Sequence, residues 1–393
     1  MRVNNPPSLP LVIYDADCDF CRFWIARWRH VTSEHVDYVS SQEVGGQFPE
    51  IPHENYQRAV QLVNPDGEVF CGAEAVFRAF THSGRRRWAL GLYQRLPGFA
   101  PVTEWFYGFI ARHRRFFSAV TRWCWGKQST RPTFFLTRWL FLRLLGVIYL
   151  IAFLSLWTQI DGLIGSNGIL PAEQYLNAVR EQIGLERYLA FPTLCWFNDS
   201  DAFLHLFCGC GVFLSLLLIV GVAPVLALIG LWVCYLSLVT VGQSFLSFQW
   251  DALLLETGFL AIFFAPLRIL PRISREATPS SVVLWLFRWL LFRLMFASGV
   301  VKLMSGDMTW SNLTALNFHY ETQPLPTVLG WYAHHLPEWF QKASVAGMFG
   351  IEIVVPFLIF APRRPRFLGA IALVALQLLI AATGNYCFFN LLT

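Results

Sequence analysis

Charged residues are scarce in this chain of 393 residues. Aspartate, glutamate, lysine and arginine make up 14% of the sequence, whereas hydrophobic residues make up 55% and aromatic residues 16%. A typical soluble domain carries about 25% charged residues, so the composition excludes an ordinary set of soluble domains. The excess of apolar side chains is expected to contact lipid, which predicts an integral membrane protein.

Two features are missing near the N-terminus. Residues 1–10 have no basic segment followed by an apolar core, so they do not resemble a secretory signal. Residues 1–130 have no long apolar run and hold a disproportionate share of the charged residues. They are therefore predicted to form a soluble domain on the cytoplasmic side, with a boundary to the membrane domain near residues 128–132.

Paired cysteine motifs are nearly absent as well. Of nine cysteines, only Cys18 and Cys21 form a Cys-x-x-Cys motif, which argues against a disulfide framework and against a zinc site built from two such pairs. No metal site and no cofactor are expected. The net charge of +5 comes largely from arginines beside apolar segments, which indicates contact with lipid head groups and no nucleic-acid partner.

Seven apolar windows follow from residue 139 onward. Each has about 17 to 22 residues, which is long enough for a helix to cross the hydrocarbon core of a bilayer. The windows cover residues 139–157, 202–220, 222–241, 250–267, 282–303, 344–361 and 367–383. The fold class is therefore predicted to be mainly α, a polytopic transmembrane helix bundle behind a small N-terminal domain.

The basic residues between the windows predict one orientation, because loops rich in arginine and lysine stay in the cytoplasm. One set of connections holds Arg112, Arg114, Arg115, Arg122, Lys127, Arg131, Arg138, Arg268, Arg272, Arg275, Arg363, Arg364 and Arg366. The opposite connections hold only Arg180, Arg187 and Lys342. The N-terminus is therefore predicted to lie inside, and the seventh window to end outside.

Ionisable residues within the windows need an explanation, because charge is costly in lipid. At about 1.5 Å per residue, Glu256 and Arg293 fall at similar depth on neighbouring antiparallel spans, and Glu352 also lies near the midplane. These three residues are predicted to form a membrane-interior polar cluster, either as a salt bridge that fixes the bundle or as a functional site. Arg143 and Arg288 are predicted to extend toward the cytoplasmic head groups.

Two outer connections, residues 158–201 and 304–343, are long and apolar, so they are predicted to fold back over the bundle. The second contains a polar and aromatic set made of Asn317, His319, Tyr320 and Glu321. This set either binds a partner or caps the bundle, and the sequence leaves both interpretations open.

The Cys-x-x-Cys motif lies between a predicted strand and a predicted helix. Residues 11–14 are apolar as in a buried strand, and residues 18–29 have apolar positions at helical spacing. Cys18 is therefore placed at a helix start, where the macrodipole and free N–H groups favour the thiolate that attacks disulfides. Cys21 is predicted to be the resolving thiol. The nearby Asp15, Asp17 and Asp19 are expected to raise the thiol pKa.

The cysteine pair has two other interpretations, half a zinc site or two thiols of the core. Its context favours the redox interpretation. A strand at 36–39, a hairpin of strands 59–63 and 69–71, and a helix at 73–82 complete a compact α/β unit of thioredoxin-like order.

Three segments of the N-terminal part carry a resemblance to a known family. They are Tyr14-Asp15-Ala16-Asp17-Cys18-Asp19-Phe20-Cys21, Asn64-Pro65-Asp66-Gly67 and Gly72-Ala73-Glu74-Ala75, and the match extends through Leu96-Pro97-Gly98 and from Tyr107 to Arg114. Through them, the first 125 residues resemble the DCC family of thiol-disulfide oxidoreductase-like proteins. The resemblance implies that Cys18 and Cys21 are the redox residues.

Longer strings in residues 140–393 carry a second resemblance. They run from Gly162 to Pro171, from Phe248 to Glu256, from Trp310 to Pro326 and from Gly384 to Tyr386. Through them, this part resembles the lipase maturation factor family, which implies a membrane bundle distantly similar to the transmembrane domain of vitamin K-dependent carboxylases. In animals such proteins support the folding of secreted lipases in the endoplasmic reticulum.

Three functions are therefore compatible with the sequence. The leading hypothesis is a membrane-anchored thiol-disulfide oxidoreductase or redox-linked folding factor of a bacterial inner membrane. The alternatives are a non-enzymatic membrane chaperone or scaffold that binds clients through its outer loops, and a membrane enzyme or lipid-binding protein with a midplane polar site. The expected partners are membrane lipids, a thiol or disulfide protein, and a secreted client such as a lipase.

The predicted domains are a thioredoxin-like domain at residues 1–84, basic amphipathic membrane-proximal helices at 85–132, and a membrane domain at 133–393. A relay of electrons across the membrane is not expected, because Cys195, Cys208, Cys210, Cys234 and Cys387 form no second Cys-x-x-Cys motif. Cys208 and Cys210 are expected to face nearly opposite sides of one helix.

Overall fold

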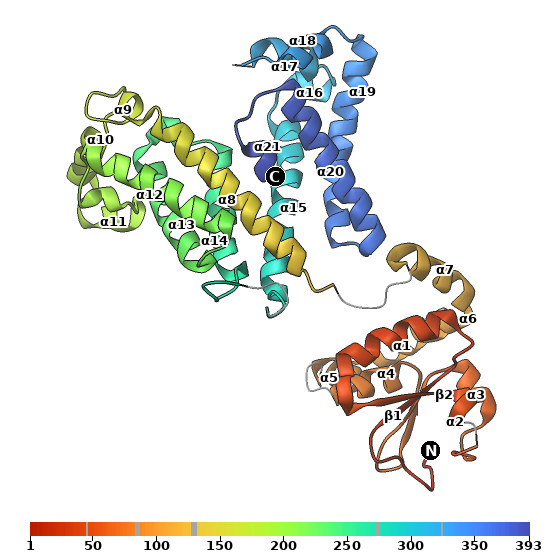
Figure 1. Ribbon diagram of the computed structural model, residues 1–393. Coiled ribbons are helices and arrows are strands. Elements are labelled where there is room, and N and C mark those ends of the chain that lie inside the picture. Colours follow the sequence, from red (N-terminus) through yellow and green to blue (C-terminus); the bar gives the residue numbers. More distant parts are fainter. Residues whose placement is uncertain (45, 83–86, 127–131, 272–275, 324) are drawn as a thin grey trace. The chain divides into compact units, whose positions relative to one another are not determined.

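The structure is a computed structural model that describes residues 1–44, 46–82, 87–126, 132–271, 276–323 and 325–393 (Figure 1). The chain divides into two compact units, formed mainly by residues 1–132 and residues 133–393. Four basic residues used to predict the orientation lie outside the described residues; they are Lys127, Arg131, Arg272 and Arg275.

The N-terminal unit is built on a four-stranded sheet in the order β2-β1-β3-β4. Strand β1 (Leu11–Tyr14) pairs in parallel with β2 (Asp37–Ser40) and antiparallel with β3 (Gln61–Val63), which forms a hairpin with β4 (Val69–Cys71). Helix α1 (Asp19–Thr32) supplies the crossover that parallel strands require. The predicted α/β order is confirmed.

Alternating side chains of β1 face two helical layers, as expected for a strand covered on both sides. Leu11 and Ile13 pack with residues on and around helices α2 and α3, whereas Val12 packs with Ile25 of α1 and Ala75 of α4. The remaining helices of the unit are α2 (Ser41–Val44), α3 (His53–Arg58), α4 (Gly72–Thr81), α5 (Arg87–Arg95), α6 (Phe99–Arg112) and α7 (Arg114–Trp125).

Two side chains attach helix α6 to the sheet and to α4. The Glu104 carboxylate accepts the backbone N–H groups of Ala73 at 3.2 Å and Glu74 at 2.9 Å, and so satisfies two free donors at the start of α4. The Tyr107 hydroxyl accepts the Val60 N–H at 2.9 Å. Helix α6 thereby forms one wall of the N-terminal unit.

In the C-terminal unit, six helices of the described part are long and apolar enough to cross a membrane. They are α8 (Phe135–Trp157), α12 (Asp201–Val220), α13 (Pro224–Val241), α15 (Ser281–Met304), the helical run Glu338–Phe360 that begins with α19 (Glu338–Phe349), and α20 (Arg363–Thr383). The predicted polytopic helix bundle is confirmed (Figure 1).

The fourth predicted window is shorter than expected. Instead of a span over 250–267, the structure has α14 (Gln249–Phe264), whose 16 residues rise about 24 Å, less than the roughly 30 Å of a hydrocarbon core. Pro266 explains the early end, because the residue before a proline is driven into extended backbone. Beyond it, the Ile269 carbonyl accepts the Ala223 N–H at 2.7 Å, so the segment after α14 returns to the beginning of α13.

The run Glu338–Phe360 is irregular in its second half. It widens to a π-helix at Gly350–Val354 and narrows to a 3₁₀-helix at Val355–Phe360. Pro356 accounts for the change, because proline lacks a backbone N–H and its ring clashes with the carbonyl four residues earlier. The wide turn contains Glu352.

The two long connections, residues 158–201 and 304–343, fold back onto the bundle, as predicted; their place outside the membrane stays a prediction. The first forms α9 (Ile160–Leu163), α10 (Ala172–Ile183) and α11 (Arg187–Ala190), and its Ile160 and Leu176 join the core that contains α8, α12 and α13. The second forms α16 (Met308–Ser311), α17 (Ala315–Thr322) and α18 (Val328–His334). Gln323 and Thr327 attach it to α20 by donating to the carbonyls of Thr383 and Ala382, each at 2.9 Å.

The last residues pack into the helix bundle. Phe388 leaves 4% of its surface exposed and belongs to the core around α8, and α21 (Phe389–Leu392) follows it. Asn390 donates to the Gln377 side chain of α20 at 2.8 Å. The segment is therefore part of the bundle.

Candidate redox site and polar pairs of the membrane domain

Cys18 is the N-cap residue of α1. Its backbone is extended, with φ −89° and ψ 107°, and its sulfur accepts the backbone N–H of Cys21 at 3.2 Å. The thiol thus occupies the position at which serine or aspartate usually caps a helix. A sulfur that accepts an N–H bond at a helix start is stabilised as the anion.

The turn before Cys18 is fixed by its own aspartates. The Asp15 carboxylate accepts the Asp17 N–H at 3.0 Å, and the Gln42 amide donates to the side chains of both aspartates at 3.3 and 3.2 Å. These contacts orient the end of β1 and the first residue of α1, so the position of the sulfur is set by the sheet.

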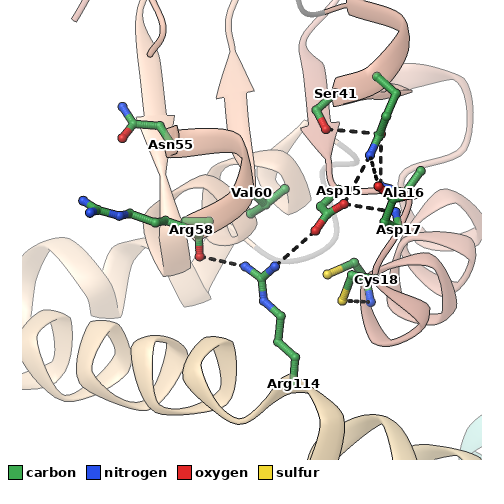
Figure 2. Close-up of polar contacts among 12 residues, drawn as sticks. Asp15, Ala16, Asp17, Cys18, Ser41, Asn55, Arg58, Val60 and Arg114 are labelled. Carbon is green, nitrogen blue, oxygen red and sulfur yellow. Dashed lines mark hydrogen bonds and ion pairs between the residues drawn. The ribbon is translucent and has the colours of Figure 1, made fainter. Parts of the chain in front are cut away.

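Arg114 is a residue of the site, although its sequence position predicted only a place in a basic connection that sets the membrane orientation. Its guanidinium donates to the Asp15 carboxylate at 3.4 Å and to the Arg58 carbonyl at 2.8 Å, as Figure 2 shows beside Cys18. The side chains of Arg114 and Asp15 leave only 22% and 19% of their surfaces exposed. Nothing in the local sequence indicates this contact, because the two residues come from distant segments.

The two thiols differ strongly in acidity. The hydrogen bond between the cysteines lowers the pKa of Cys18 to about 6, with Arg114 adding to the effect while burial and Asp15 oppose it. The same contact and burial raise the pKa of Cys21 well above its ordinary value. At neutral pH, Cys18 is therefore mainly a thiolate and Cys21 a neutral thiol; the roles of nucleophile and resolving thiol stay predictions. Of the three aspartates predicted to raise the pKa of Cys18, Asp15 does so, and its effect is smaller than the opposite effect of Arg114.

The described residues contain no group of three or more histidine, cysteine, aspartate or glutamate side chains that could hold a metal ion. A zinc site at Cys18 and Cys21 would need further ligands of this kind. All nine cysteines are free thiols. Cys208 is buried and Cys210 is exposed, so the two lie on different faces of α12.

Arg293 of α15 and Glu256 of α14 form an ion pair. Their side chains leave 52% and 45% of their surfaces exposed, so the pair lies at the edge of the protein. Opposite charges that meet in lipid remove much of each other's cost. The structure therefore brings together two of the three residues of the predicted polar cluster.

Glu352 is not the third member of that cluster. Both of its carboxylate oxygens accept from the Lys302 ammonium, at 2.8 and 2.7 Å, and the side chain leaves 5% exposed. Lys302 lies nine residues after Arg293 on α15, about 13.5 Å farther along the helix. Lys302 lies inside the predicted window 282–303, but it was not among the residues predicted to form the cluster.

The outer-loop residues are separated into two contacts. His319 of α17 is 3.3 Å from the Tyr386 hydroxyl, and Glu321 is 3.0 Å from His334 of α18. Asn317 and Tyr320 lie on the same short helix and are partly buried. These contacts join α17 to its neighbours, and a role of the four residues in binding a client stays a prediction.

Comparisons with known proteins separate the chain into the same two parts. Residues 136–393 match the family described as lipase maturation factor transmembrane domain, and residues 12–120 match the family described as DCC1-like thiol-disulfide oxidoreductase. Both resemblances found in the sequence are thereby confirmed. No solved structure matches the chain significantly.

Several vertebrate proteins are similar to the membrane part. Lipase maturation factor 2 of Xenopus laevis is 52% identical over 267 residues, which cover 66% of this chain and 38% of that protein. Lipase maturation factor 2 of Homo sapiens is 48% identical over 277 residues, covering 66% and 39%. Lipase maturation factor 1 of Mus musculus is 41% identical over 270 residues, covering 66% and 47%.

This chain therefore spans less than half of the length of these relatives. The family match and the six apolar helices show an integral membrane protein. The vertebrate origin of the relatives gives no support to the predicted bacterial inner membrane.

Proposed function

Because the chain belongs to the lipase maturation factor family, we propose that it is a membrane-anchored thiol-disulfide oxidoreductase that assists the maturation of client proteins. The observation that carries the proposal is the pairing of Cys18 and Cys21 at the start of α1. The Cys18 sulfur accepts an N–H bond and favours the anion, while Cys21 is a partly buried thiol with a raised pKa. A nucleophile and a resolving thiol require this difference.

In the reducing direction, the Cys18 thiolate attacks one sulfur of a client disulfide. A bond forms between Cys18 and that sulfur, the client S–S bond breaks, and the second client sulfur leaves as a thiolate. Cys21 then attacks Cys18 and its proton passes to the departing client sulfur. Two electrons have moved from the cysteine pair to the client, which holds two thiols, and a dithiol reductant returns the pair to its starting state.

The reverse direction uses the same atoms. A client thiolate attacks the Cys18 sulfur of the Cys18–Cys21 disulfide, Cys21 leaves, and the client's second thiolate displaces Cys18. Stabilising the Cys18 thiolate favours this direction, because it stabilises the reduced pair relative to the disulfide. The low pKa of Cys18 therefore favours a pair that oxidises its clients.

Trapping in the full-length protein tests the proposal. With Cys21→Ser, the mixed disulfide at Cys18 cannot be resolved, so covalent complexes that disappear on reduction should accumulate. Cys18→Ser should give none, and Cys71→Ser is the matched control, because Cys71 is an exposed thiol away from the motif. Absence of mixed disulfides together with tight zinc binding by the wild-type chain would overturn the proposal.

The proposal extends to the identity of the client and to the side of the membrane on which the redox pair meets it. The names of the relatives make a lipase the first client to test, and trapped complexes should then contain a lipase. The predicted threading puts the cysteine pair on the side of the basic loops, so clients of the redox pair are met there. Membrane lipids are the other partner, contacted by the apolar faces of the long helices.

A second candidate function, a scaffold that holds clients without redox chemistry, is supported by exposed apolar side chains on the second outer connection. They are Phe318, Val328, Leu329, Trp331, Tyr332 and Trp339. Exposed apolar patches of this kind mark contact with a protein or a membrane interface. Trp331→Ser with Leu329→Ser should abolish client association in the scaffold function, while leaving disulfide trapping by Cys21→Ser intact.

A further inference from the structure

The N-terminal unit contains a cavity of about 510 Å³ beside the cysteine pair. Its walls come from α1, α4 and α6 and are largely aromatic or aliphatic; they include Trp24, Trp28, Phe77, Trp105 and Phe106. Cys21, Asp15 and Arg114 also line it. The volume is in the range of small-molecule pockets, and a molecule in this cavity would contact Cys21, the partly buried resolving thiol of the redox pair.

Two residues that line the cavity, Trp24 and Tyr56, each carry a polar atom without a hydrogen-bond partner among the residues that the structure describes. The indole Nε1 of Trp24 is buried and has no hydrogen-bond partner among the residues that the structure describes. The hydroxyl of Tyr56, another lining residue, is also buried and also has no hydrogen-bond partner among these residues. Both atoms are shielded from solvent, so an acceptor oxygen of a bound molecule would reach either of them only after the side chain turns toward the cavity. Buried donors without acceptors are rare in proteins, so this turn would gain a hydrogen bond with a molecule that brings acceptor oxygens.

The charges around the cavity favour a neutral molecule. Arg114 is already engaged by the Asp15 carboxylate and the Arg58 carbonyl, and Asp15 also accepts from Asp17 and Gln42. An anionic head group would meet no unpaired cation there. A peptide would bring backbone N–H groups into walls made almost entirely of carbon, where unsatisfied donors are costly.

We propose that this cavity binds a quinone, which takes electrons directly from the Cys18–Cys21 pair; this inference rests on the redox function proposed above. A quinone is neutral, planar and apolar, and its polar atoms are two carbonyl oxygens that only accept hydrogen bonds. One carbonyl would accept the Trp24 indole N–H once that side chain turns toward the cavity, and the quinone ring would pack against the aromatic walls. Quinones also act as electron acceptors for protein disulfide formation in other systems.

The electrons and atoms balance within this site. The Cys18 thiolate and the Cys21 thiol become a disulfide, and two electrons pass to the quinone. Its two carbonyl oxygens become hydroxyls by taking one proton from Cys21 and one from solvent. The disulfide then takes two electrons from a client dithiol, so the complete cycle oxidises client thiols at the expense of the quinone.

The test uses the full chain, reduced, freed of reductant and held in detergent without oxygen. Decyl-ubiquinone is the probe, because its fully substituted ring prevents thiol addition. The expected result is loss of the quinone absorbance with two thiols lost per quinone, and no reaction in Cys18→Ser. Exchange of the same samples with a soluble aromatic disulfide is measured in parallel.

Two variants test whether the quinone reacts in the cavity. Trp24→Phe keeps an aromatic ring but removes the indole N–H, and it should raise the quinone concentration for half-maximal rate by about tenfold. Ala111→Phe adds a ring to the cavity wall and should lower the rate at least tenfold. Trp88→Phe is the control, because Trp88 is exposed on α5 and lies outside the cavity. An azido-quinone should label peptides from α1 and α6, a measurement that is independent of these variants.

The outcomes separate the two proposals. Disulfide exchange without quinone reduction in the wild-type chain overturns the quinone inference and leaves the oxidoreductase function standing. Absence of both reactions overturns both. Quinone reduction that Trp24→Phe and Ala111→Phe leave unchanged, or azido labelling confined to the membrane helices, also rejects the cavity as the quinone site.

Discussion

Arg114 and Asp15 are 99 residues apart in the chain, yet the Arg114 guanidinium lies 3.4 Å from the Asp15 carboxylate next to the redox pair. The contact compensates a negative charge that would otherwise destabilise the Cys18 thiolate. It also connects the start of α7 to the end of β1, so the acidity of Cys18 depends on helices that follow the sheet.

Arg114→Met should make Cys18 a weaker acid. The guanidinium lowers the pKa of Cys18, so its removal raises that pKa and leaves less thiolate near pH 6. Alkylation of Cys18, followed by mass spectrometry of its peptide, should slow by about two- to tenfold at pH 6 and be unchanged at pH 9.

The neighbouring exposed Arg115 provides the matched control for this prediction. Arg115→Met also removes one positive charge, one position later, and should leave the pH dependence of Cys18 alkylation unchanged. In the wild-type chain the rate should rise through about pH 6 and then level off. An Arg114→Met profile that coincides with wild type would exclude the guanidinium as a determinant of the thiol pKa.

Gly72→Ala should destabilise the N-terminal unit. Gly72 has φ +66°, a backbone conformation that alanine adopts only with strain. The added Cβ would also lie 2.5 Å from a Glu104 carboxylate oxygen and would disturb the contact with α6. The backbone cost alone is about 1 to 2 kcal/mol. Thermal proteolysis of the full chain should show earlier cleavage within residues 1–125. Gly91→Ala, in a helix with open space around it, should instead stabilise by about 1 kcal/mol.

Lys302→Met should be strongly destabilising. The substitution leaves the Glu352 carboxylate buried without its partner, which costs about 3 to 5 kcal/mol for a buried pair. Thermal unfolding in detergent measures the effect. The double variant Lys302→Met with Glu352→Gln removes both charges and should recover most of the loss; failure to recover would mean that the lysine acts through packing alone.

Exchanging the charges of the other membrane pair tests its geometry. Glu256→Arg or Arg293→Glu alone places two like charges together and should lower the yield of folded protein in the membrane. The double exchange restores an ion pair between α14 and α15 and should restore the yield. Because the pair is half-exposed, the effect should be smaller than that of Lys302→Met. A double variant as poor as the singles would contradict the pairing.

The orientation is testable by labelling single cysteines in intact cells. Positions 363–366 lie in a basic connection and are predicted to be shielded inside, whereas positions 310–330 are predicted to react with an impermeant reagent. Arg364→Cys and Phe318→Cys are suitable exposed positions. Labelling of position 364 from outside would reverse the proposed side of the redox pair.

The local parts of the fold could be predicted, because each depends on a pattern within a short segment. Alternation and turn residues located β1 and the β3–β4 hairpin, and apolar length located the long helices. The position of Cys18 at the start of α1 followed from the change between these patterns. The early end of α14 was not predicted, because the window 250–267 was defined by its apolar residues alone and the effect of Pro266 on the helix was not considered.

The contacts between distant segments could not be predicted. Arg114 was assigned to membrane orientation, since a basic side chain before an apolar helix has that role by default. Depth alone suggested Glu352 as a partner for Arg293, but depth does not specify which helix face a residue occupies. Lys302 provides that partner instead, and no local pattern identifies it.

The limited length of α13 and α14 has a consequence for the surrounding lipid. Helices of 18 and 16 residues rise about 27 and 24 Å, less than the hydrocarbon thickness of an average bilayer. Such a hydrophobic mismatch thins the bilayer locally, at a cost that grows with every ångström of difference. The bilayer is therefore expected to be thinner beside α13 and α14 than beside the longer α8 and α15, so a thinner membrane would lower the cost of holding this side of the bundle.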